Sequence, residues 1–232
     1  MAAMIEDLQS WMPFTGALTA FLASHAIPTR PPIRRRLVGI VGERAYLFLY
    51  SAMSLLLLAW LFRSAGEAPF VELWPVQEWQ PVVPRILVPL AFAIGTVGLA
   101  TANPLSLSID RRELDRRPSS ILGVTRHPVL WALALWAAAH LAPNGDLAHV
   151  LLFGMLLTLC LGGMVLMDRR SARRLGKAEW IELAATRPLL PFSRPAALRR
   201  PTQREVLLGL VGLLLAGAFG VLHGSIIGTP AF

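Results

Sequence analysis

Long uninterrupted apolar runs constrain this chain more than any other feature of its sequence. Four runs, residues 45–62, 82–102, 147–167 and 206–227, are close to the length of about 20 residues that crosses a bilayer. Two shorter runs, 11–27 and 127–141, complete an expected set of about six spans. The run 127–141 rises only about 22 Å, so its helix must begin near Ile121 or be sheathed by neighbouring helices. We therefore expect an all-α integral membrane helical bundle, formed as a single transmembrane domain over residues 1–232.

The composition agrees with a membrane protein. Hydrophobic residues make up 55% of the chain and charged residues only 16%, whereas a soluble domain carries about 25% charged residues. Glu6 and Asp7 stand where a cleavable secretory signal carries basic residues, so we expect the first span to be retained. The single cysteine, Cys160, excludes an intramolecular disulfide, and a buried apolar role suits its place within a span.

The basic residues are distributed unevenly between the two sides of the predicted bundle. Twenty of the 22 Lys and Arg residues lie in three alternate connections, 28–44, 103–126 and 168–205. The opposite side holds only Arg63 and Arg85, together with several acidic residues. Because excess Lys and Arg remain in the cytoplasm, we expect both termini to face outward. The net charge of +8 is then a topology signal, and no nucleic-acid partner is expected.

Two segments have patterns that predict contact surfaces, one for lipid headgroups and one for a neighbouring helix or cofactor. In the 168–204 connection, Trp180, Leu183 and Ala184 share a helical face, which indicates a cytoplasmic amphipathic helix lying on anionic lipid headgroups. In the last span, small residues recur at every fourth position from Ala216 to Gly224. This spacing lets another helix, or a flat cofactor, approach the backbone closely.

Histidines are the candidate functional residues, because ionisable side chains within spans face the bundle interior or a cavity. Depth places two candidates near the cytoplasmic ends of spans, His25 and His127, and two further out, His140 and His223. His149 begins a span beside an outer loop and is the weakest candidate. Depth therefore favours an inner pair, His25 with His127, and an outer pair, His140 with His223, with structural hydrogen bonding as the alternative role.

Haem fits this histidine pattern better than a hydrolytic metal. The sequence has no HExxH motif, no Cys/His zinc spacing and no GxSxG or phosphate-binding glycine loop. Isolated histidines on separate apolar helices instead suit a haem held between helices. His127 and His140 are thirteen residues apart and point to nearly opposite faces, so they cannot bind one iron together.

Several stretches resemble the NnrU family of bacterial membrane proteins. They are FLASHAIP (21–28), VGERAYLFLYS (41–51), TRHPVLWALALWAAAHLAPNGD (125–146), LLFG (151–154), MDRRSARRLG (167–176) and LLPF (189–192), together with His223. The resemblance implies an inner-membrane protein associated with nitrite and nitric oxide reduction, with a membrane reductase as an expected partner. The family is similar to the plastid zeta-carotene isomerases, which use haem b to isomerise a cis double bond.

Carried over from those isomerases, the two iron ligands fall on His25 and His140. The isomerases also have a cysteine three residues before the second ligand, where this chain has Ala137. Helix rise separates His25 from His140 by about 15 Å in depth, so a tilted or broken first helix would have to bring them together. His223 is the substitute partner.

Arg126 and His127 complete the cofactor-binding candidates, as groups that hold a haem propionate, with lipid phosphate as the alternative partner of Arg126. Asn144 and Asp146 either orient a ligand imidazole or form a turn.

The resemblance leaves the activity open between a redox protein, an isomerase acting on a hydrophobic polyene, and a non-enzymatic assembly factor for a membrane reductase. A second resemblance is to membrane methyltransferases of the isoprenylcysteine type, through the RHP motif at 126–128 and the later PF at 191–192. Those enzymes carry paired glutamates after the next span. This chain has Arg169 and Arg170 there, so the resemblance implies a shared fold without the catalytic motif.

Overall fold

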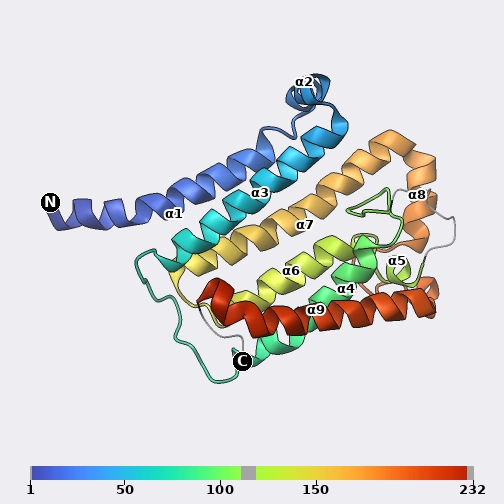
Figure 1. Cartoon of the computed structure of the whole chain (residues 1–232). Helices are drawn as coiled ribbons and strands as arrows, with labels where there is room; N and C mark the ends of the chain where they lie inside the picture. The colour runs from blue at the N-terminus through green and yellow to red at the C-terminus, as the bar shows by residue number, and fades with distance from the viewer. Residues whose placement is uncertain (1, 111–118, 229–232) are drawn as a thin grey trace. The chain divides into compact units, whose positions relative to one another are not determined.

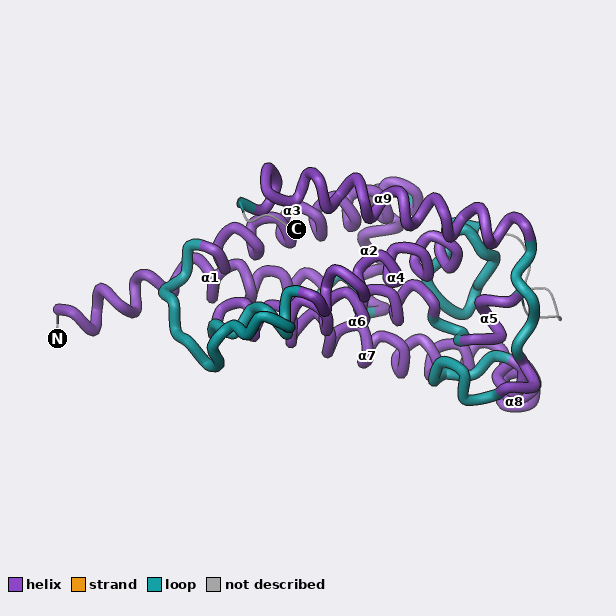
Figure 2. The backbone as a smooth tube through the Cα atoms, turned by 90° about the horizontal axis from the view of Figure 1, so that it is seen from below, coloured by secondary structure: helices purple, strands orange, loops and turns teal. Residues whose placement is uncertain are grey.

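The computed structural model describes residues 2–110 and 119–228, and the regular elements of this part of the chain are helices (Figure 2). An isolated bridge between Glu72 and Asp146 is the extended pairing found in these residues. The chain divides into two compact units, one of Met1–Pro75 with Gly145–Leu152 and one of Val76–Asn144 with Phe153–Phe232. Four arginines of the 103–126 connection, at positions 111, 112, 116 and 117, lie outside the described residues.

The first unit is built on two helices that lie side by side, α1 (Ala2–Ala26) and α3 (Glu43–Gly66) (Figure 1). α1 is continuous although Pro13 lies within it, so the first helix is not broken. Phe14, Ala17 and Phe21 are buried along one face, as a helical spacing of three and four residues allows. A short arginine-rich helix, α2 (Pro31–Val41), joins the pair and packs against α3.

The Asn-Gly-Asp turn pairs with the outer loop of the same unit. The backbone N–H of Leu73 donates to the carbonyl of Gly145 at 2.7 Å, and Leu147 N–H donates to the carbonyl of Val71 at 2.9 Å. A Cβ atom at Gly145 would lie 2.1 Å from the carbonyl oxygen of Trp74, so this close approach requires glycine.

The second unit is organised around α4 (Val82–Leu99), which packs against α6 (Pro128–Leu141) and α9 (Gln203–Ile227) (Figure 1). Gly212 permits the contact of α9 with α4, because a Cβ there would lie 2.6 Å from the carbonyl oxygen of Phe92. The helix α7 (Leu147–Leu175) begins in the first unit and continues in the second. Leu130 and Ala134 of α6 pack against Met164 of α7.

The fourth predicted span does not begin near Ile121, and that part of the prediction is wrong. A separate short helix, α5 (Ser120–Val124), ends before Thr125, whose backbone is extended, and α6 begins only at Pro128. Proline has no N–H to donate and disfavours helical geometry in the residue before it, so the helix starts at the proline. The resulting helix has only 14 residues, and six of its side chains are buried.

Within residues 2–110 and 119–228, four helices are long and apolar enough to cross a membrane, namely α3, α4, α7 and α9. These match the four long apolar runs, which confirms an all-helical membrane protein within the described residues. α6 is a shorter apolar helix, and α1 is helical without reaching the same mean hydropathy over its described residues. A set of six spans with both termini outside remains a prediction.

The 168–204 connection differs from its prediction at the start. α7 continues to Leu175, so the separate helix α8 spans only Lys177–Thr186 after Gly176, which has a positive φ of 85°. Trp180 and Leu183 do lie on α8, and the chain leaves the helix before Pro188, as expected. A short 3₁₀ turn, η1 (Pro195–Ala197), precedes α9.

Candidate functional site

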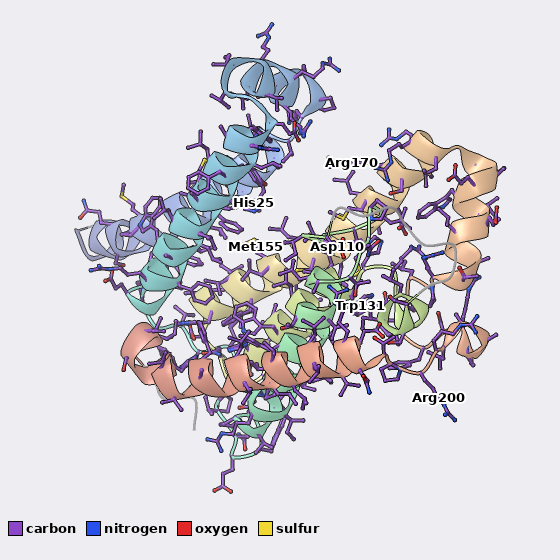
Figure 3. All side chains as sticks on the ribbon, turned by 45° about the vertical axis from the view of Figure 1, so that its right-hand side comes forward. His25, Asp110, Trp131, Met155, Arg170 and Arg200 are labelled. Atoms are coloured by element: carbon purple, nitrogen blue, oxygen red, sulfur yellow. The ribbon has the colours of Figure 1, made fainter. Side chains whose placement is uncertain are left out.

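His25 lies at the last turn of α1, and contacts fix its imidazole ring on both sides (Figure 3). Its Nδ1 is 2.8 Å from the carbonyl oxygen of Phe21, one turn earlier in the same helix. Its Nε2 is 3.1 Å from the hydroxyl of Ser54 on α3. The ring also packs on Phe21, with 4.2 Å between ring centroids, and edge-on against Tyr50. Hydrogen bonds therefore connect this histidine to both helices of the first unit.

His140 lies at the last turn of α6 and repeats part of this arrangement. Its Nδ1 is 2.8 Å from the carbonyl oxygen of Trp136, again four residues earlier. Its ring lies 4.7 Å from the Trp136 ring and stacks on Phe153 of α7 at 5.1 Å. Among the described residues, Nε2 of His140 has no hydrogen-bond partner. Two aromatic rings thus fix the plane of this half-buried imidazole, and its outer nitrogen is left available.

The backbone contacts of the two histidines determine which ring nitrogen carries a lone pair. A carbonyl oxygen only accepts hydrogen bonds, so Nδ1 of a neutral His25 or His140 must carry the proton. Nε2 then presents its lone pair, which in His25 accepts the hydrogen bond from the Ser54 hydroxyl. Histidines that bind metals commonly donate their other ring N–H to a backbone carbonyl in this way. Both side chains therefore have the tautomer that an iron ligand needs.

His223 lies on α9, is half-buried and interacts electrostatically with His140 of the same unit. This proximity agrees with the outer pair that the depth argument favours. Among the described residues, no group of three or more His, Cys, Asp or Glu side chains could hold a metal ion.

His127 and Arg126 meet a carboxylate that the sequence reasoning missed, Asp168. The fully buried His127 ring places Nε2 2.8 Å from Oδ1 of Asp168. Arg126 donates to both carboxylate oxygens, through Nε at 2.8 Å and through Nη2, and its Nη1 donates to the carbonyl of Arg187 at 3.1 Å. The guanidinium carbon of Arg126 also lies 5.4 Å from the centroid of the Trp180 ring on α8. The donors of Arg126 thus have partners within the protein.

The tautomer of His127 is opposite to that of the other two histidines. A carboxylate held by arginine accepts the Nε2–H, so the lone pair of a neutral His127 lies on Nδ1. That nitrogen is buried without a hydrogen-bond partner in the described part of the chain. Binding of a haem propionate by Arg126 and His127 would have to compete with Asp168. A sequence signal for Asp168 exists, because it is the first charged residue after the apolar run 147–167.

Asn144 and Asp146 do not orient the His140 ring. The Asn144 side chain donates to the backbone carbonyl of His140 at 2.7 Å and does not touch the ring. Asp146 instead accepts from Nδ1 of His149 at 2.9 Å and from its backbone N–H, which places the carboxylate at the start of α7. The carboxylate–imidazole pair predicted for this turn therefore exists, but with the histidine that the sequence ranked last.

A family model described as NnrU protein matches residues 13–231, nearly the whole chain. No curated protein and no solved structure matches the chain.

Proposed function

The chain belongs to the NnrU family, and we propose that it is a membrane protein that binds haem b, with His25 and His140 as the iron ligands. The proposal places it in the inner membrane of a bacterial cell, where both nitrogen-oxide metabolism and lipophilic substrates are accessible. The observation that carries it is the contact of Nδ1 with a backbone carbonyl in both histidines. In each, Nδ1–H is used by the carbonyl four residues earlier, and Nε2 is the nitrogen with the lone pair.

The surroundings of the two imidazoles also suit a haem ligand. Aromatic rings, Phe21 beside His25 and Trp136 with Phe153 beside His140, hold each ring plane in one orientation. Apolar contact around an iron ligand and a fixed ligand orientation are two means by which a protein tunes a haem. When bound, the haem would supply one-electron transfer, binding of a nitrogen oxide, or isomerisation of a cis double bond in a polyene. His223, which interacts with His140, is the substitute ligand if His25 keeps its contact with Ser54.

The second candidate is a non-enzymatic accessory factor for a membrane reductase. One contact favours it, the hydrogen bond of 3.1 Å between Nε2 of His25 and Ser54. In that role His25 links α1 to α3, and no cofactor is held.

The visible absorption spectrum of the purified full-length protein, oxidised and reduced, separates these candidates. Haem binding predicts a Soret band that is lost in His140→Ala and His25→Ala. His149→Ala is the matched control, because its imidazole is held by Asp146, and it should keep the band. Loss in His140→Ala and His223→Ala but not in His25→Ala would assign the substitute pair. A folded, colourless wild-type protein produced with ample haem would refute the cofactor and favour the accessory role.

A further inference from the structure

The connection between α8 and α9 borders an open pocket of about 400 Å³. Its walls come from Ala185 and Thr186 at the end of α8 and from residues 194–197 and 199 around η1. Small side chains and one proline, Pro195, form most of the wall, and the two arginines, Arg194 and Arg199, supply its charge. The described residues that line the pocket include no histidine, so a role for the pocket is independent of the haem proposal.

Hydrogen bonds hold this connection at the ends of the apolar helices of its unit. The Thr125 hydroxyl and the Trp131 Nε1–H both donate to the carbonyl of Leu189, at 2.9 and 3.0 Å. Arg204, at the start of α9, donates to the carbonyl of Ala100, just beyond the end of α4. Figure 3 labels Trp131 on α6 and Arg200 in the connection before α9. The pocket therefore lies where three apolar helices end, which is the level of lipid headgroups.

Apolar side chains of the connection point away from the protein. Leu190 is 58% exposed, Phe192 is 66% exposed and Leu198 is 41% exposed. Phe192 also has a φ of 61°, a left-handed conformation that costs energy for a bulky residue. In water, the strained backbone of Phe192 and the exposure of its phenyl ring would both be unfavourable. The same ring among lipid chains at the membrane interface would be stabilised.

The charge of the connection is of one sign. Residues 187–202 include four arginines and no acidic residue. Nη1 of Arg194 donates to the carbonyl of Ala185 at 2.6 Å, which fixes its guanidinium at the pocket wall and leaves its other N–H groups without partners among the described residues. A guanidinium pairs with phosphate through two parallel hydrogen bonds. The chemistry that complements this wall is a phosphate attached to an apolar tail.

We propose that this pocket binds the headgroup phosphate of an anionic phospholipid from the surrounding bilayer. Arg194 and Arg199 bind the phosphate, and Leu190 and Phe192 lie among the acyl chains. Basic pockets beside transmembrane helices on the arginine-rich side bind acidic headgroups by the same forces.

Native mass spectrometry of the full-length protein in detergent, titrated with phosphatidylglycerol or phosphatidylcholine, tests this site. We expect phosphatidylglycerol to bind more tightly. The double variant Arg194→Gln/Arg199→Gln should weaken its binding about 25-fold, since each arginine near an anionic lipid surface contributes about a fivefold gain. Arg35→Gln/Arg36→Gln removes the same charge from α2 and should leave binding within about twofold of wild type.

A second variant separates the pocket from its charge. Ala196→Trp fills the pocket and keeps both arginines, so it should weaken phosphatidylglycerol binding even if the double arginine variant fails to fold. Equal binding of the two lipids, or equal losses in the two double-arginine variants, would overturn the proposal. Displacement of phosphatidylglycerol by millimolar inorganic phosphate would also overturn it, by assigning the pocket to a free anion.

Discussion

At Asp168, a single carboxylate accepts hydrogen bonds from two side chains that are themselves screened from water. Arg126 and His127 follow one another just before α6, and Asp168 lies 41 residues beyond His127, in the C-terminal part of α7. The Arg126 guanidinium would not be stable in this setting alone, because a buried charge without a partner keeps its desolvation cost. The carboxylate therefore connects the segment just before α6 to the arginine-rich end of α7.

Asp168→Asn should destabilise the protein by about 3 kcal/mol, because it leaves Arg126 largely buried with only carbonyl partners. Chemical unfolding in mixed micelles measures this change. Glu67→Gln is the control, because it removes a carboxylate from an ion pair with Arg63 in which both side chains are exposed. That variant should lose less than about 1 kcal/mol. Equal losses in the two variants would mean that the Asp168 cluster contributes no more than a surface pair.

The sequence predicts the histidines but not their partners. His25 and His140 stand out because imidazoles are costly within apolar helices. Their contacts at i−4, Phe21 and Trp136, also follow from helical spacing. Ser54 and Phe153 could not be predicted, since each comes from another helix whose rotation the sequence does not specify. Asp146 does not orient a proposed ligand imidazole for a local reason: an aspartate before a helix binds the nearest free N–H groups, here those of His149.

At the scale of helices, close packing depends on single glycines. A Cβ at Gly98 of α4 would lie 2.7 Å from Cβ of Pro128, the first residue of α6. Gly212 brings α9 equally close to the backbone of α4. The small-residue spacing noted in the sequence began at Ala216, and Ala216 is buried in this contact. The closest approach lies at Gly212, four residues before Ala216, so it extends the predicted series by one turn on the same helical face.

Gly212→Ala should destabilise the protein by about 2 kcal/mol, because the new methyl group meets backbone atoms of α4 that cannot move aside. Thermal unfolding in detergent should show a lower midpoint. Gly217→Ala is the matched control on the same helix, since no described atom lies within 4 Å of its added Cβ. Alanine there should be neutral or slightly stabilising, because it favours the helix. A Gly212→Ala protein as stable as wild type would show that α4 and α9 do not pack closely.

The lengths of the apolar runs predicted the long helices, whereas local residues such as proline determined where the helices begin and end. The four long runs became helices because a segment in lipid must satisfy its own backbone hydrogen bonds. The expected start near Ile121 ignored Pro128, although a proline is a strong signal for a helix start. The short α6 fits the other predicted option, burial among neighbouring helices, since most of its buried residues are alanines and it packs against α4 and against Met164 of α7. The helix α2 was not predicted from the sequence, because its arginines were interpreted as the cytoplasmic end of the first span.

For the whole molecule, orientation in the membrane is a question of charge. The arginine-rich segments include α2, the end of α7 and the connection that leads into α9. Translocating these charges would oppose both the membrane potential and the attraction of anionic lipids. The same asymmetry would place the proposed phosphate pocket on the cytoplasmic side and the Asp146–His149 pair on the opposite side. The orientation of the protein in the membrane therefore bears on both the lipid proposal and the proposal for the outer histidines.

Cysteine labelling from one side of the membrane tests this orientation. In a Cys160→Ala background, Ser225→Cys places a thiol at the exposed C-terminal end of α9, and Ser193→Cys places one in the arginine-rich connection before that helix. A maleimide that cannot cross membranes should label Ser225→Cys in spheroplasts, and Ser193→Cys only after the membrane is opened. The reversed pattern would mean that the arginines lie outside. Among the described residues after α8, α9 is the only helix long and apolar enough to cross a membrane. Labelling of both thiols from one side would therefore mean that α9 does not cross it.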